Sequence, residues 1–289
     1  MLRILKTKPE LSELLDIAND NLPQLIDLQS ALKLYLNDLT PDSPIEVYAY
    51  PWPQPRALAY IVRNKFIRTY VSFKLTKSGT LLDVDQLLDA APNFFDDFKE
   101  FTSYNTDFAI YKHLNERIEA KFDFTPQNLC RYVYMPIGKQ QEVANMDVVL
   151  PEGYRFIQLD AERDAEFITS TWKHAAATEL ANTKTKIAHL PSVGVKFHDS
   201  LVAFEMLYPV GAMNHLFVVP EHRGKGLGKA VELKLCQKMI EMNIWPYKFV
   251  ESSNTIATSM TIKSDLWLST SKSDSDRATL FNFCAATRR

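Results

Sequence analysis

The chain has 289 residues, which is more than one hydrophobic core usually serves, so two domains are expected. Its 46% apolar and 24% charged residues are typical of a globular protein and exclude a chain dominated by disorder. A net charge of −2 gives no bulk attraction to nucleic acid or to an anionic membrane, so neither is expected as a partner.

The three cysteines, Cys130, Cys236 and Cys284, lie far apart in apolar surroundings. This fits buried reduced thiols better than a disulfide framework. No apolar stretch approaches the roughly 20 residues that span a bilayer, and the first 16 residues carry three carboxylates, unlike a secretory or transit peptide. We expect an intracellular protein, cytoplasmic or mitochondrial, without a bound metal.

The first half begins with a short apolar stretch, Met1–Leu5. The patterns that follow predict, in order, helices Leu11–Ala18 and Leu22–Leu39, strands Ile45–Tyr50, Ala57–Val62 and Ile67–Leu75, helices Leu82–Phe98 and Phe108–Ala120, and strand Arg131–Met135. The polar segment Gly138–Asn145 lacks periodicity, so we place a boundary there between domains 1–140 and 146–289.

The second half repeats this order. The patterns predict strand Tyr154–Leu159, helices Ala161–Ala176 and Thr178–Ile187, strands Val193–Phe197, Leu201–Tyr208 and Ala212–Val219, a helix from Leu227 to Ile240, strand Tyr247–Val250, helix Asn254–Ser264, and a closing pair of strands, Leu266–Leu268 with Thr279–Ala285. Two copies of one α/β (α+β) fold in tandem would explain the repeat. Two unrelated α/β domains remain the alternative.

Three of the eight glycines fall within five residues, at Gly224, Gly226 and Gly228, between a predicted strand and a predicted helix. Closely spaced glycines let successive backbone N–H groups turn toward an anionic oxygen at a helix N-terminus. The turn therefore predicts a phosphate site. At the equivalent place the first copy has Leu75–Gly79, with one glycine and no arginine, so we expect no cofactor there.

The glycine spacing distinguishes between the known kinds of phosphate-binding turn. A dinucleotide fold would place G-x-G-x-x-G after its first strand, and a nucleotide P-loop would need G-x-x-x-x-G-K-[ST]. Here the turn follows a fourth strand and reads Arg-x-x-Gly-x-Gly, from Arg223 to Gly228. The segment Phe217–Gly228 closely resembles the acetyl-CoA signature of the GNAT N-acyltransferase superfamily.

Within that superfamily the last 120 or so residues resemble the glycine N-acyltransferases. The residues that carry this resemblance are Leu190-Pro191-Ser192, Gly211, Pro220-Glu221, Arg223, Gly226-Leu227, Val250, Ser253-Asn254 and Met260, with a weaker match at Trp172. The resemblance implies two tandem GNAT-like acyl-CoA N-acyltransferase domains, the N-terminal one degenerate.

The resemblance also implies which residues bind acetyl-CoA or another acyl-CoA. They are Phe217, Val218, Val219, Arg223, Gly224, Lys225, Gly226, Leu227, Gly228, Lys229 and Asn254. The turn would hold the pyrophosphate, the strand would pair with the pantetheine amides, and an N–H near Leu216–Val218 would polarise the thioester carbonyl. Asn254 has a second interpretation, as a helix N-cap. We expect a larger side chain at Gly226 or Gly228 to strain the turn.

The catalytic base is where the sequence departs from the family. The glycine N-acyltransferases carry a glutamate directly after the glycine that matches Gly211, and this chain has Ala212 there. Attack on a thioester needs a neutral amine, so another base is expected. Candidates are Glu205 on the preceding strand, His215 and Glu251, with a water chain or no base as alternatives.

The expected activity is transfer of an acyl group from CoA to a small amine or an amino acid such as glycine, by direct attack without a covalent intermediate. A catalytically impaired acyl-CoA-binding protein and a protein or peptide N-acetyltransferase are the alternatives. No motif in the sequence identifies the acyl chain, the acceptor or the oligomeric state.

Overall fold

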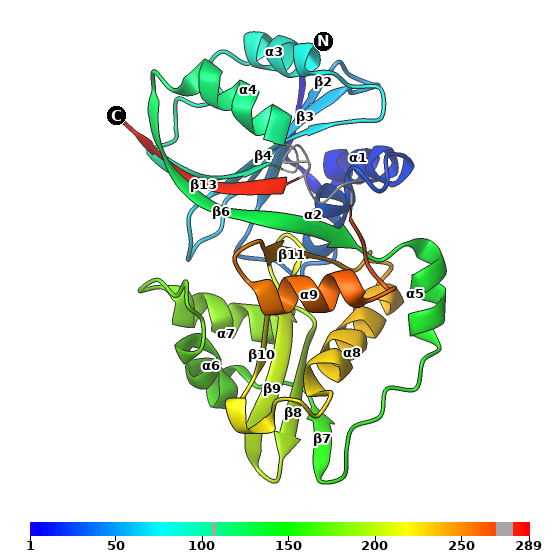
Figure 1. The fold of residues 1–289 in the computed structure, drawn as a ribbon. Helices are drawn as coiled ribbons and strands as arrows, with labels where there is room; N and C mark the ends of the chain where they lie inside the picture. Colours follow the sequence, from blue (N-terminus) through cyan, green and yellow to red (C-terminus); the bar gives the residue numbers. More distant parts are fainter. Residues whose placement is uncertain (106–107, 270–279) are drawn as a thin grey trace. The chain divides into compact units, whose positions relative to one another are not determined.

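The computed structural model describes residues 1–105, 108–269 and 280–289 (Figure 1). The chain divides into two compact units. The first unit comprises Met1–Val133 and Phe249–Arg289, and the second unit comprises Tyr134–Lys248. The last 41 or so residues therefore group with the N-terminal part rather than with the second half of the sequence.

The first unit contains a twisted sheet with helices on both faces. Its elements are β1 (Arg3–Leu5), α1 (Lys8–Asp20), α2 (Ile26–Leu36), β2 (Ile45–Tyr50), β3 (Ala57–Val62), β4 (Tyr70–Leu75), α3 (Leu81–Ala90), β5 (Glu100–Asn105), α4 (Phe108–Ile118), β6 (Phe122–Tyr134), α9 (Thr255–Lys263), β12 (Leu268–Ser269) and β13 (Leu280–Arg288). The strand order is β1-β2-β3-β4-β5-β13-β6, in which only the neighbours β4 and β5 are parallel.

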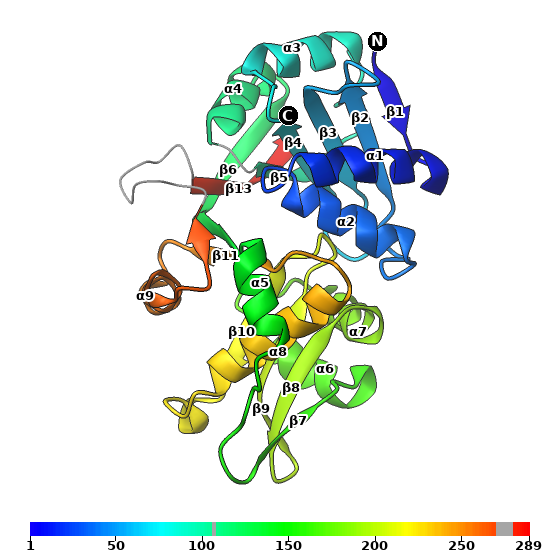
Figure 2. The same ribbon diagram turned by 90° about the vertical axis from the view of Figure 1, so that its right-hand side faces the viewer.

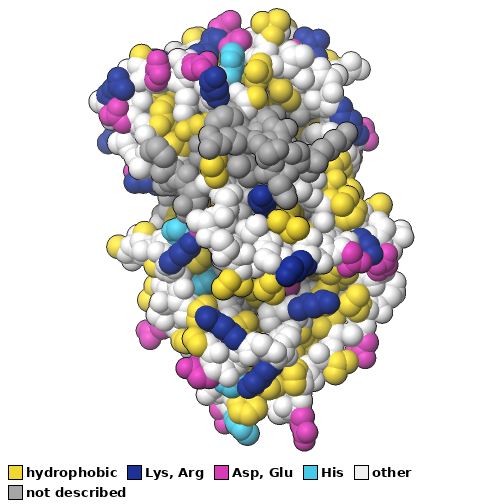
Figure 3. Space-filling model, in the orientation of Figure 1, with side chains coloured by type: hydrophobic (Ala, Val, Ile, Leu, Met, Phe, Trp, Pro, Cys, Tyr) yellow, Lys and Arg dark blue, Asp and Glu magenta, His cyan; other side chains and the backbone are white. Residues whose placement is uncertain are grey.

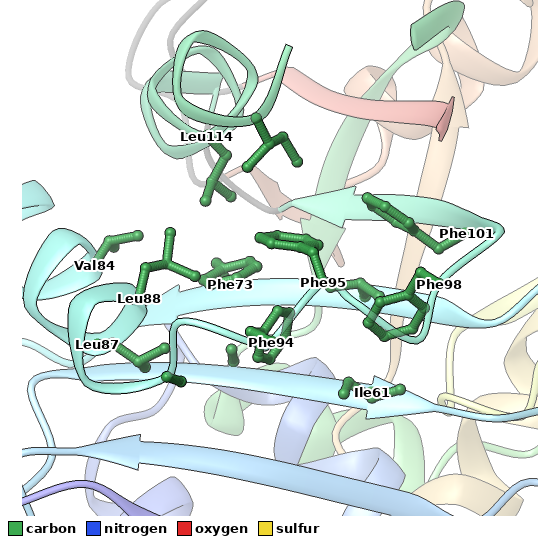
Figure 4. Packing of buried hydrophobic residues seen from close by; sticks show 14 of the residues in the cluster. Ile61, Phe73, Val84, Leu87, Leu88, Phe94, Phe95, Phe98, Phe101 and Leu114 are labelled. Carbon is green, nitrogen blue, oxygen red and sulfur yellow. The ribbon is translucent and has the colours of Figure 1, made fainter. Parts of the chain in front are cut away.

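One face of this sheet carries an aromatic core (Figure 4). Ala57, Ala59 and Ile61 of β3 alternate along the strand and share the core with Val71 and Phe73 of β4, because alternate residues of a strand point to one face. The loop after α3 adds three phenylalanines, among which Phe94 and Phe95 meet edge to face with ring centroids 4.8 Å apart. Buried residues of α3 and α4 complete the core.

The opposite face of the same sheet is polar at its centre. Asp27 of α2 accepts a hydrogen bond from the Tyr60 hydroxyl (2.7 Å) and lies 2.5 Å from Lys74 Nζ, and all three side chains are buried. A buried charge is tolerated only when it is paired, so this ion pair ties α2 to β3 and β4.

The second unit repeats the arrangement (Figure 2). Its elements are α5 (Ile137–Ala144), β7 (Tyr154–Ile157), α6 (Ala161–Ser170), α7 (Glu179–His189), β8 (Ser192–Phe197), β9 (Ser200–Leu207), β10 (Met213–Val218), the short 3-10 helix η1 (Pro220–His222), α8 (Leu227–Glu241) and the start of β11 (Tyr247–Glu251). Strands β7, β8, β9 and β10 are antiparallel neighbours in that order, and β10 runs parallel to β11.

The two copies match element by element, as the sequence predicts. The series β1-α1-α2-β2-β3-β4-α3-β5-α4 corresponds to β7-α6-α7-β8-β9-β10-α8-β11-α9. In both series the only parallel neighbours are the fourth strand and the strand after the next helix, β4 with β5 and β10 with β11. The tandem α/β duplication is therefore confirmed.

Several predicted boundaries are wrong. The helix expected over 82–98 ends at Ala90, because the following phenylalanines enter the core from a loop, and β5 then forms at 100–105. The helix expected over 161–176 ends at Ser170. The polar segment 138–145 forms α5, because Gln237 of α8 donates to the carbonyls of Val143 (2.9 Å) and Met146 (2.7 Å) at its end.

The predicted closing pair of strands is also wrong. β12 pairs with β6, whereas β13 lies between β5 and β6 in the first unit. Thr279 lies outside the described residues. The three cysteines are buried, and within the described residues none of them forms a disulfide, as expected. In the described ranges, no helix combines the length and apolar character needed to cross a membrane.

Candidate acyl-CoA site

The glycine turn forms the start of α8. Gly224 has φ +77° and Gly226 has φ +80°, a region that residues with a Cβ rarely adopt. Gly226 is the N-cap of α8, no side chain caps the helix, and its first turn holds no acidic residue. A Cβ built at either glycine would meet nothing within 4 Å. The first N–H groups of α8 therefore face open space at the positive end of a 15-residue helix, which is suited to an anion.

Basic side chains surround this helix start. Arg223, Lys225 and Lys229 are exposed, and Figure 3 shows Lys and Arg side chains on the face of the molecule that carries η1 and α8. Arg223 is oriented by its Nε, which donates to the carbonyl of Val218 at the end of β10 (3.0 Å). The turn therefore combines backbone N–H donors with positively charged side chains.

Tyr154 of β7 contacts residues of the turn and of η1. Lys225 Nζ donates to the Tyr154 hydroxyl oxygen (3.0 Å), and that hydroxyl pairs with Nδ1 of His222 (2.9 Å). The Tyr154 ring also packs on Phe197 of β8, with centroids 4.8 Å apart. Sequence reasoning missed Tyr154 because it lies 71 residues before Lys225.

The corresponding helix in the first copy begins differently. Thr80 is the N-cap of α3, and its N–H and hydroxyl both donate to Asp83 (2.9 Å each). The loop before it closes on its own chain, since a Cβ at Gly79 would lie 2.1 Å from the Arg56 carbonyl oxygen. A carboxylate therefore already occupies the start of α3, where it would repel a phosphate.

β10 separates from both neighbours in its middle. Its register with β11 is a single pair, Met213 with Lys248, and its register with β9 shifts between Asn214 and Phe217. His215 lies at this bulge with φ +60°. The bulge releases residues 215 and 216 from the ladder, whereas Phe217 and Val218 pair with β9 again. The segment 215–218 can therefore offer an N–H to an extended ligand at the bulge and on its edge away from β9.

The His215 side chain lies on the α6 and α7 side of the sheet. Its Nε2 is 3.0 Å from Thr171 Oγ1, and its ring lies between Trp172 (4.7 Å) and Phe204 (5.0 Å). Burial lowers the pKa of His215 to about 3, and the charge of Lys186 lowers it further. A hydrogen bond with the backbone of Thr171 acts in the opposite direction. The ring is therefore neutral at physiological pH.

Lys186 belongs to a buried ion pair within α7. Its Nζ lies 2.9 Å from Glu179 Oε1, and Asn182 donates to the same oxygen (3.1 Å). Burial lowers the pKa of Lys186, and the Glu179 carboxylate opposes this shift. The charge of Lys186 in turn contributes to the lowered pKa of His215.

Glu205 lies on the other face of the sheet. Its neighbours Phe204 and Met206 belong to the apolar cluster with α6 and α7, so Glu205 points toward α8. The side chain is 2% exposed, and its Oε2 has no hydrogen-bond partner among the described residues. Burial raises its pKa well above the usual value, as does the charge of Glu232, which pairs with Lys248.

The remaining positions singled out in the sequence are Glu251, Asn254 and Ala212. Glu251 and Asn254 belong to the first unit, and Asn254 accepts a hydrogen bond from the Ala257 N–H (3.1 Å), so its interpretation as an N-cap is confirmed. Ala212 is 4% exposed, and its carbonyl accepts from the Tyr208 N–H (2.8 Å). The described residues contain no group of three or more His, Cys, Asp or Glu that could hold a metal ion.

Comparisons with known proteins agree with this geometry. Residues 158–261 match the acetyltransferase (GNAT) family. A Drosophila protein of known structure superposes over 99% of this chain and 98% of its own, with a TM-score of 0.77 and 17% identity. A GCN5-related N-acetyltransferase from Sphaerobacter thermophilus covers 99% and 95%, with a TM-score of 0.54 and 11% identity.

A tandem GNAT protein from the clavulanic acid biosynthesis pathway, solved without acetyl-CoA, also covers 99% of this chain and 98% of its own. Its TM-score is 0.52 and its identity is 10%. These likenesses show the fold, a tandem pair of α/β units that this chain shares with those proteins over nearly its full length. A search of curated proteins by sequence found no match.

Proposed function

We propose that this protein is an acyl-CoA-dependent N-acyltransferase whose glycine turn binds the CoA pyrophosphate. The premise is the GNAT match of residues 158–261. The observation that carries the proposal is the uncapped start of α8, where Gly224 and Gly226 adopt positive φ and leave the helix N–H groups open. In the other copy, Asp83 occupies the equivalent helix start, so we assign acyl-CoA binding to the second copy alone.

The residues around the turn have complementary roles in this proposal. The N–H groups from Gly224 to Gly228 donate to the pyrophosphate, since the Arg223 N–H already donates to the Pro220 carbonyl (3.2 Å), while the Arg223, Lys225 and Lys229 side chains supply charge. Phe217–Val219 pairs with the pantetheine amides along the edge of β10 that faces away from β9, and an N–H from 216–218 polarises the thioester carbonyl. Leu227 anchors the start of α8 in the core, being 1% exposed.

The acceptor in this proposal is a small amine or an amino acid such as glycine. The resemblance to the glycine N-acyltransferases supports an amino acid, and direct attack on the thioester requires no covalent enzyme intermediate. A protein or peptide N-terminus is the alternative acceptor within the same reaction. Three buried cysteines that form no disulfide in the described part of the chain favour a reducing compartment, cytoplasmic or mitochondrial.

A second function, acyl-CoA binding without catalysis, is favoured by Ala212. This position has no side chain that could accept a proton, and it is nearly buried. If this alternative holds, CoA binds normally and no amine is acylated.

Release of free CoA thiol tests the proposal. Acetyl-, benzoyl- and long-chain acyl-CoA are each paired with the twenty amino acids and a set of amines and peptides, and CoA binding is measured by calorimetry. Acceptor-dependent thiol release supports the transferase. Binding without release, together with activity gained in Ala212→Glu, supports the alternative. Absence of CoA binding rejects both.

A further inference from the structure

We propose that Lys225, held in place by Tyr154, binds the 3′-phosphate of CoA, so that the protein distinguishes CoA from its 3′-dephospho form. The inference rests on the proposed function, since it assigns a second anionic group of the same ligand. CoA carries a pyrophosphate and, on the ribose beyond it, a phosphate monoester, a group with a charge of about −1.5 to −2 at pH 7. The N–H groups of the glycine turn bind the pyrophosphate, and the monoester needs a cation of its own.

Two neutral oxygens hold the Lys225 ammonium. Its Nζ donates to the Tyr154 hydroxyl oxygen (3.0 Å) and lies 3.5 Å from the Glu221 carbonyl oxygen. Because the hydroxyl oxygen accepts from Lys225, its own proton is directed to His222 Nδ1, 2.9 Å away, and each donor then has an acceptor. These partners leave the positive charge of Lys225 available to an anion.

Several other basic side chains of the second unit pair with a carboxylate instead. They are Arg155, Arg163, Lys184 and Lys186. Arg223 resembles Lys225, since its Nε donates to a neutral group, the Val218 carbonyl (3.0 Å). A cation held by a neutral group can form a charge-assisted hydrogen bond to a phosphate without breaking an ion pair.

Arg223 and Lys225 are fixed in different directions from the turn. Val218 is the last residue of β10, whereas Tyr154 is the first residue of β7, and β9 and β8 lie between these two strands in the sheet. In CoA, the pantetheine arm and the 3′-phosphoadenosine leave opposite ends of the pyrophosphate. With the pantetheine arm along β10, on the Arg223 side, the 3′-phosphate extends toward Lys225.

Tyr154 is itself fixed, so it is a positioning residue for Lys225. Its ring packs on Phe197 of β8 with centroids 4.8 Å apart, and it meets the His222 ring at 87° with centroids 5.7 Å apart. A lysine side chain has many rotamers, so an ammonium that is held before the ligand arrives lowers the entropy cost of binding. Loss of the hydroxyl should therefore weaken the phosphate contact and leave the ring in place.

Calorimetry of the full-length protein with CoA and with dephospho-CoA, which lacks only the 3′-phosphate, tests the inference. The wild type should bind CoA about tenfold more tightly than dephospho-CoA at low ionic strength. The difference should shrink as salt is added, because salt screens contacts between exposed charges. Equal affinity of the wild type for the two ligands would overturn the inference.

Two variants and their combination assign the preference to residues. Lys225→Gln should remove most of it, with the dephospho-CoA dissociation constant unchanged. Tyr154→Phe should weaken CoA binding about 2- to 10-fold, the range of one hydrogen bond, and also leave dephospho-CoA binding unchanged. In the double variant, Tyr154→Phe should add nothing to the loss in Lys225→Gln, because it acts through Lys225. A full additional loss would contradict the positioning role of Tyr154.

Lys229→Gln is the matched control at the same turn. Lys229 lies in the first turn of α8 and is exposed, so its loss should weaken CoA and dephospho-CoA by the same factor through the pyrophosphate. Lys184→Gln of α7 should change neither dissociation constant. If Lys225→Gln also weakens both ligands equally, Lys225 serves the pyrophosphate, and the inference is overturned while the proposed function stands. Binding of neither ligand by the wild type overturns the proposed function itself.

Discussion

At the scale of residues, Glu205 and His215 show that the position of a side chain in the fold changes its pKa. Both lie beside the same bulge, yet they point to opposite faces of the sheet. Burial raises the pKa of Glu205 well above its usual value, whereas it lowers the pKa of His215 to about 3. The same burial thus shifts the two pKa values in opposite directions, because it disfavours the charged form of each group.

The glycines of the turn are unequal, which corrects the sequence-based expectation that both Gly226 and Gly228 protect it from strain. Gly226→Ala puts a Cβ on a backbone at φ +80° and should cost about 1–2 kcal/mol of unfolding free energy. Gly228 lies in the helix, and its added Cβ would sit 3.5 Å from Val218 Cγ2, an ordinary contact. Gly228→Ala should therefore be neutral, or stabilise α8 by up to about 1 kcal/mol.

Urea unfolding and acetyl-CoA calorimetry check this pair. The dissociation constant should rise at least about tenfold for Gly226→Ala and change little for Gly228→Ala. Equal loss of affinity in both variants would mean that the phosphate approaches Gly228 too closely to admit a Cβ, and that this close approach matters as much as the left-handed conformation of Gly226.

At the scale of elements, the same strand–turn–helix unit occurs in both copies, but its helix starts differently in each. α8 starts with an open glycine and no acidic side chain, whereas α3 starts with a capping box in which Asp83 binds Thr80. Burial acts to raise the pKa of Asp83, but the Thr80 N–H and the Arg56 guanidinium outweigh it, and the net shift is downward. The first helix start is thus stabilised by its own anion.

Asp83→Asn should destabilise the first unit by about 1 kcal/mol at pH 7, because it removes the charged cap. A carboxylate with a lowered folded pKa contributes stability above its unfolded pKa of about 3.9, and that contribution is lost as pH falls through the folded value. The difference between Asp83→Asn and wild type should therefore shrink below about pH 4. Denaturant unfolding at pH 7 and pH 3.5 measures it, and a difference that grows on acidification would contradict the assignment.

At the scale of the whole molecule, sequence order and compact units do not coincide. β13 comes from the end of the chain and completes the first unit's sheet between β5 and β6. Cys284 and Ala286 are fully buried there, and Arg288 Nε donates to the carbonyl of Phe98 (2.8 Å). The first unit therefore depends on the last residues of the chain.

A chain ending at Ser269 should lose the first unit's stability, because β5 and β6 would each lose a partner strand and the core would lose part of its cover. Hydrogen exchange of the β5 and β6 amides, compared with those of β8 and β9, measures the effect. Unchanged protection in β5 and β6 would show that β13 is dispensable.

Sequence alone determined the tandem order of elements and the phosphate turn, because alternation, helical periodicity and glycine spacing are local properties of the chain. It could not find α5, whose carbonyls are bound by Gln237 of α8, or β5, which lies beside β13 from the far end of the chain. Nor could it choose among the candidate bases.

The tertiary structure showed the different surroundings of the candidate bases and the contact of Tyr154 with the turn. Glu205 and His215 are both plausible bases in the sequence, and only the bulge in β10 and the Thr171 hydroxyl give them different surroundings. Tyr154 reaches Lys225 across 71 residues. Each of these features depends on groups distant in sequence that folding brings within hydrogen-bond range, and local patterns carry no record of such pairs.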